Sequence, residues 1–130
     1  MLKRLWQDQA ANSTVEFVIA APVLVSFMVG ILQIGQVMHA NGAMRNAIGD
    51  GIRYAKVYPD ATETQVLNET RAGMAGVNVD GITELQFVRG TANGAAFGRI
   101  TMQYELQPMI PFAPMPPIVI EEERTAYLPS

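Results

Sequence analysis

The sequence contains no cysteine and a single histidine, His39. The absence of cysteine excludes disulfide bonds and thiolate metal sites, and it is compatible with a reducing or an oxidising compartment. Because a zinc or nucleophilic site needs partner groups that one histidine cannot supply, we interpret His39 as a surface residue near a membrane interface. We predict no cofactor, no metal site and no enzymatic activity.

Charge is also scarce, since charged residues make up 16% of the 130 residues and the net charge is −3. The nine basic residues are scattered. Nucleic-acid binding relies on clustered lysine and arginine, so we predict no nucleic-acid partner. A chain of this length has room for one small domain with an appendage.

No charged residue occurs between Phe17 and Leu32, and apolar residues continue to Met38. This tract of about 22 residues matches the ~20 that a helix needs to cross a bilayer. We predict a membrane span over about residues 15–38. Lys3 and Arg4 precede it, so the N-terminus is expected in the cytoplasm and the C-terminal part is expected to be exported.

Two other interpretations of this tract remain open. A cleaved secretory signal would be cut near Ala20 and Ala21, yet Pro22 follows at once and much of the apolar tract is still to come. A buried helix of a soluble protein would present a polar face, and none is present before Gln33.

Beyond residue 35 the tract becomes amphipathic, with apolar residues at helical spacing at Val37, Met44, Ile48, Ile52 and Ala55. We predict one helix over about 15–55, ~60 Å long at 1.5 Å per residue. Interior glycines weaken this prediction, because each costs roughly 1 kcal/mol relative to alanine.

A second, shorter helix is predicted over 62–75, with Thr62 as its N-cap and Gln65 completing a capping box. Alternating apolar and polar residues then predict strands over 82–89, 99–107 and 118–128. Strict alternation is typical of an antiparallel sheet with one solvated face.

Two connectors join the predicted strands. Residues 90–98 form a glycine- and alanine-rich loop that we interpret as too long for a tight hairpin turn. Residues 108–117 contain five prolines, which favour an extended connector covering one end of the sheet, or alternatively a partner surface.

The apolar face of a three-stranded sheet must be covered. The nearest available cover is the amphipathic half of the long helix. We therefore predict an α+β fold in which a membrane-rooted helix packs its outer half on a small antiparallel sheet. Three adjacent carboxylates, Glu121 to Glu123, alternate between the two faces of their strand, so we expect a solvated strand end and no calcium site.

Glu16 is an acid at the start of the apolar tract, where ionisable residues are costly and usually functional. One interpretation is that its carboxylate reaches the cytoplasmic interface. The other is that proteolysis upstream creates an α-amino group that pairs with Glu16 of the same or a neighbouring subunit. Such a pair would fix the register between helices.

The basic head, the small residue Ala11 followed by NSTVEF, the apolar tract with Pro22 and the stretch IGDGIRYA at 48–55 together resemble type IV pilin precursors. They resemble most specifically the TadE-like minor pilins, or pseudopilins, of the tight-adherence pilus. The resemblance covers 11–58. It implies a prepilin-peptidase cut between Ala11 and Asn12, where the family usually has glycine before the cut and this chain has alanine.

The resemblance divides the chain into a leader at 1–11, a long helix at 12–58 and an exported globular domain at 59–130. It implies an assembly motif at Glu16 and Phe17 and a helix that first contacts lipid and then sister subunits. The residues expected on that helix surface are Phe17, Pro22, Leu24, Phe27 and Ile31.

The function implied is that of a structural minor pilin in the bacterial inner membrane, acting in assembly, priming or the tip of the pilus. Its implied partners are other pilin subunits, the prepilin peptidase, the inner-membrane assembly platform and lipid. The alternative is a permanently anchored single-pass envelope protein whose exported domain binds a partner or ligand.

Overall fold

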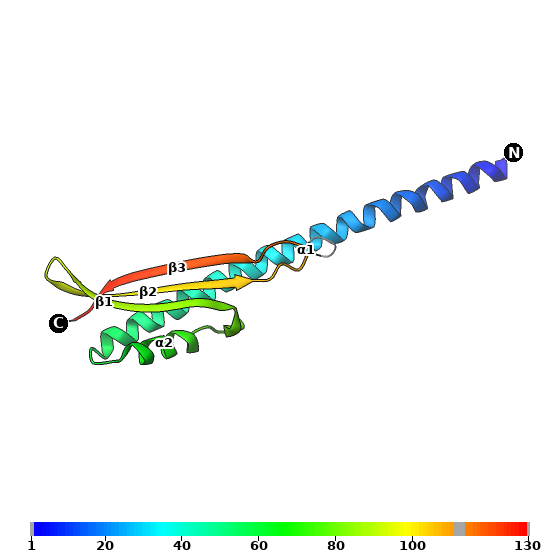
Figure 1. Cartoon of the computed structure of the whole chain (residues 1–130). Coiled ribbons are helices and arrows are strands. Elements are labelled where there is room, and N and C mark those ends of the chain that lie inside the picture. Colours follow the sequence, from blue (N-terminus) through cyan, green and yellow to red (C-terminus); the bar gives the residue numbers. More distant parts are fainter. Residues whose placement is uncertain (1, 111–113, 130) are drawn as a thin grey trace.

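The computed structural model describes the backbone of residues 2–110 and 114–129, and the side chains of residues 12–110 and 114–129. Over these residues the chain forms a long helix, a short helix, a 3-10 turn and three strands. In order, these are α1 (Leu2–Val57), α2 (Glu63–Ala72), η1 (Val79–Gly81), β1 (Ile82–Ala92), β2 (Ala95–Leu106) and β3 (Ile118–Tyr127). The predicted α+β fold is confirmed, and Figure 1 shows that only the second half of α1 packs on the sheet.

Helix α1 is unbroken and begins well before the predicted start at residue 15. Its interior glycines do not interrupt it. At Gly51 a close approach explains why the residue is glycine. A Cβ there would overlap Thr70 Oγ1 of α2 and lie 2.8 Å from Ile100 Cδ1 of β2. The glycine therefore lets α1, α2 and the sheet meet at one point.

Helix α2 begins as predicted, because the Thr62 side chain accepts from the Gln65 amide and the Gln65 side chain accepts from the Thr62 amide. This capping box satisfies donors that the first helical turn leaves free. The helix ends at Ala72 rather than at the predicted residue 75, because Gly73 caps it through bonds to Glu69 and Thr70 carbonyls.

The three strands form one antiparallel sheet in the order β1-β2-β3. The prediction of a long loop at 90–98 is wrong. Both strands continue to the pair Ala92 and Ala95, and only Asn93 and Gly94 remain between them, with φ of 53° and 80°. Positive φ at both central residues is the geometry of a type I′ hairpin turn, which Asn-Gly favours.

The core lies between the outer half of α1 and the inner face of the sheet, as predicted. Met44 and Ile48 of α1 are 0% and 2% exposed, and they belong to one buried cluster with Ile100 and Met102 of β2. Val37, the first residue of the predicted apolar face, is only half-buried. Small residues on the same face of α1 bring α2 and the sheet close: Ala40, Ala43, Ala47 and Ala55.

Polar contacts hold the edges of this core. Arg89 of β1 donates through Nη2 to the Ala61 carbonyl at 2.9 Å and through Nη1 to the Pro59 carbonyl, both in the α1–α2 connection. On β2, Tyr104 donates its hydroxyl hydrogen to the Asn78 carbonyl at 3.0 Å. These bonds tie the sheet to the segments that flank α2.

Candidate functional site: the projecting half of α1

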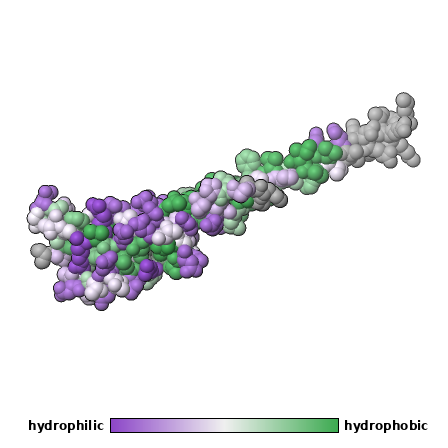
Figure 2. All heavy atoms as spheres, in the orientation of Figure 1, coloured by the Kyte–Doolittle hydropathy of each residue, from purple (hydrophilic) through white to green (hydrophobic). Residues whose placement is uncertain are grey.

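The first half of α1 projects beyond the sheet. Every described side chain from residue 12 to residue 32 is exposed or half-exposed, including Phe17 at 71%, Phe27 at 69% and Ile31 at 68%. Figure 2 shows the apolar surface running along this part of the helix. The segment is about 21 residues or ~31 Å long, which equals the thickness of a bilayer's hydrocarbon core.

The large side chains predicted for this surface share one side of the helix. At 3.6 residues per turn, Phe17, Leu24, Phe27 and Ile31 fall within about 80° of its circumference. Pro22 lies on the opposite side, which continues into the face that packs on the sheet. Four of the five predicted residues therefore lie on one side of α1, and Pro22 lies on the other.

Pro22 lies inside α1 without ending it. Proline has no amide hydrogen, so the carbonyl four residues earlier loses its helical donor. One turn later the Ser26 hydroxyl donates to the Pro22 carbonyl at 2.8 Å, so this polar side chain is satisfied within the helix. A hydroxyl bonded in this way can lie in lipid without an unpaired donor.

Glu16 is exposed one helical turn after Asn12. No ion pair joins it to any residue among 12–110 and 114–129. Residues four apart lie on the same face of a helix, and side chains lean toward its N-terminus. Residue 12 is therefore the neighbour of Glu16 one turn earlier on the same face of the helix. The side chains of Lys3, Arg4 and Ala11, to which roles were assigned above, lie outside the described set.

The projecting segment ends where the connector between β2 and β3 contacts α1. The Gln33 side-chain oxygen accepts from the Met109 amide at 2.8 Å, and Gln36 Nε2 contacts the Met109 sulfur at 3.2 Å. Gln33 is only 7% exposed. The connector was expected to cover one end of the sheet, and its described part contacts the helix at this level; residues 111–113 of that prediction lie outside the described residues.

Further along α1, an open groove of about 730 Å³ lies between the end of α2 and β3. Arg45 lines it and donates to Glu122 of β3 at 2.9 Å, so Glu122 faces the helix and is not part of a wholly solvated strand end. His39 is exposed, as predicted, and its Nε2 lies 3.2 Å from the Gly76 carbonyl. Among the described residues, no three His, Asp or Glu side chains gather as metal ligands.

Sequence reasoning missed the contacts at Gln33, Arg89 and Glu122. A glutamine that ends a long apolar tract was a usable signal for the first, because a polar residue there marks a change of environment. The other two depend on pairings between distant segments, for which the local sequence holds no signal.

The part of α1 described above also matches a known family. The model of the family described as TadE-like protein matches residues 12–53. No curated protein and no solved structure gives a significant match. Among the described residues, one helix, Asn12–Val57, is long and apolar enough to cross a membrane. Residues 12–53 are therefore similar to the TadE-like family, which is the family that the sequence resembles.

Proposed function

We propose that the chain is a structural minor pilin, or pseudopilin, of the tight-adherence pilus, held in the inner membrane by α1 before assembly. One observation carries the proposal: a helix of bilayer length has its apolar surface uncovered and continues without a break into a folded domain. Such a surface requires lipid or other apolar helices around it. A minor pilin meets both in turn, first in the membrane and then in the filament.

In this proposal residues 1–11 are a leader, residues 12–58 the assembly helix and residues 59–130 the exported domain. Lys3 and Arg4 keep the leader in the cytoplasm. The prepilin peptidase cuts between Ala11 and Asn12. The assembly platform then extracts the subunit.

The proposed cut gives Glu16 a partner. It places a new α-amino group on Asn12, one turn before Glu16 and on the same face of the helix. An ammonium within about 4–6 Å stabilises a carboxylate in an apolar setting. The pair can form within one subunit or between neighbours, and only the second arrangement fixes the register of adjacent helices.

The processing step is tested by the intact mass of membrane-extracted protein made with and without a prepilin peptidase. We expect loss of residues 1–11 only when the peptidase is present. A full-length chain under both conditions contradicts the processing step and favours the permanently anchored protein, whose exported domain offers the groove beside Arg45 as a binding surface.

The role of Glu16 is tested by Glu16→Ala, with Glu69→Ala on the exposed surface of α2 as the matched control. Breaking a buried charge pair is strongly destabilising, so we expect incorporation into pili to fall more than about tenfold while processing continues. The control should assemble normally. Normal incorporation of Glu16→Ala would remove the proposed role of the carboxylate.

A further inference from the structure

A second segment of the chain shares the chemistry of the projecting helix. No charged residue occurs from Leu106 to Ile120, just as none occurs from Phe17 to Met44. Residues 106–120 contain the connector between β2 and β3, and residues 17–44 contain the end of the projecting helix. In sequence they are far apart.

The fold brings these two charge-free segments together. The bonds that Met109 forms with Gln33 and Gln36 place the start of the connector against α1, and Figure 1 shows its described parts beside the helix at the end of the sheet nearest the projecting half. Apolar side chains there are exposed. We call this surface the collar and define it by Ile34 at 62%, Met38 at 70%, Met109 at 62% and Met115 at 52% exposure.

We propose that the collar lies in the interfacial layer of the outer leaflet of the membrane that α1 crosses. If residues 12–32 fill the ~30 Å hydrocarbon core, Gln33 and the connector fall directly at its outer boundary. The proposal rests on the membrane insertion included in the proposed function. It adds a second attachment of the exported domain to lipid, beside the helix itself.

The chemistry of the connector suits this layer. Burying a charge there would be costly, and the collar and its flanks carry none. Pro108, Pro114, Pro116 and Pro117 have no amide hydrogens, so fewer backbone donors lose water when the connector meets the bilayer. The Met109 amide is satisfied by Gln33. Methionine side chains are flexible and apolar, and they adapt to an irregular lipid surface.

The absence of native cysteine allows a direct test on the full chain. Single variants Phe27→Cys, Met115→Cys and Val88→Cys each receive an environment-sensitive fluorophore and are reconstituted into phosphatidylglycerol–phosphatidylethanolamine vesicles. All three side chains are at least half exposed, at 69%, 52% and 50%, so labelling should not disturb folding. Quenching is measured with lipid-attached nitroxide and, separately, with aqueous iodide.

We expect the Phe27 and Met115 probes to be quenched by lipid nitroxide at least about twofold more than the Val88 probe, and to be shielded from iodide. Quenching at Phe27 together with free access of iodide to Met115 would overturn the collar and leave the span intact. Shielding of Met115 without lipid quenching would mean that protein covers it, which also overturns the proposal. Absence of lipid quenching at Phe27 would overturn the span and the collar together.

Discussion

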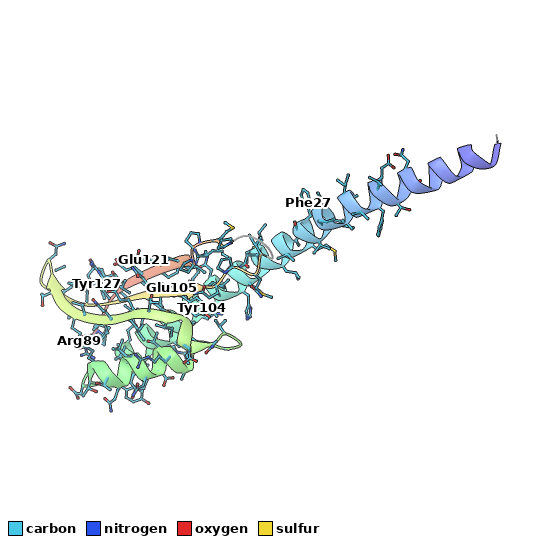
Figure 3. All side chains as sticks on the ribbon, turned by 45° about the vertical axis from the view of Figure 1, so that its right-hand side comes forward. Phe27, Arg89, Tyr104, Glu105, Glu121 and Tyr127 are labelled. Atoms are coloured by element: carbon cyan, nitrogen blue, oxygen red, sulfur yellow. The ribbon has the colours of Figure 1, made fainter. Side chains whose placement is uncertain are left out.

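The two halves of α1 are one continuous helix in two different surroundings. In the first half, large apolar side chains such as Phe17 and Leu24 are 71% and 63% exposed. In the second half, Met44 and Ile48 are almost fully buried against the sheet. Figure 3 shows the contrast, with Phe27 on bare helix and Tyr104 within the packed domain. The helical backbone continues through both halves, with one hydrogen bond fewer at Pro22, so the halves differ mainly in what surrounds their side chains.

The difference teaches that the helical backbone of α1 extends beyond the part that tertiary packing covers. A helix stabilised by its own backbone bonds persists in lipid, where those bonds have no competition from water. In water, most helical stability comes from packing of one face. The same substitution should therefore change the free energy of unfolding by very different amounts in the two halves.

The largest expected effect comes from removing a buried side chain. Ile48→Ala should destabilise the folded domain by about 2–5 kcal/mol, because it leaves a cavity between α1 and the sheet. Ile31→Ala removes the same atoms from the projecting half, so it should change the free energy of unfolding by less than about 0.5 kcal/mol. Urea unfolding of the full chain in detergent micelles, followed by circular dichroism, measures both. Equal effects would contradict the comparison.

An added charge should impair membrane insertion in the projecting half and have no effect on insertion in the second half. Leu24→Lys places an ammonium near the middle of the span and should disfavour insertion by about 2.5–3.5 kcal/mol. Asn46→Lys, at an exposed position of the second half, should leave insertion unchanged. The measurement is the fraction of chain that resists alkaline extraction from membranes. If both variants stay fully integrated, the projecting half is not the membrane span.

The smallest effect distinguishes two glycines of the second half. Gly51→Ala should destabilise the domain by about 1–3 kcal/mol, because its methyl group would overlap Thr70 and crowd Ile100. Gly42 has no atom within 4 Å of an added Cβ, so Gly42→Ala should stabilise the helix by up to about 1 kcal/mol. Thermal unfolding of the two variants checks the sign of each effect. Stabilisation by Gly51→Ala would mean that the three elements do not meet there.

Local patterns in the sequence predicted most of the fold. The alternation at 99–107 matches the buried side chains of Ile100, Met102 and Tyr104, and Thr62 and Gln65 form the capping box that their spacing indicates. The hairpin was missed because glycine and alanine at 90–98 carry no alternation. The Asn-Gly pair at 93–94 was the available signal, since it favours the turn that the structure contains.

The candidate site was less predictable than the fold. The apolar tract points to the projecting half of α1, the TadE-like match covers both halves, and the isolated position of Glu16 was visible in the sequence. The point where the projecting segment ends was not visible in the sequence. Apolar residues continue to Met38, yet the connector meets the helix at Gln33 through a bond to Met109. That contact joins segments 76 residues apart, beyond the reach of any local pattern.

The sequence by itself determined a helix that is apolar on all sides in its first part and amphipathic in its second, because hydrophobic periodicity is a property of neighbouring residues. Only the tertiary structure decided where the free helix ends and that a charge-free connector meets it there. These depend on contacts between segments far apart in the chain, and such contacts form only when the sheet has folded against α1.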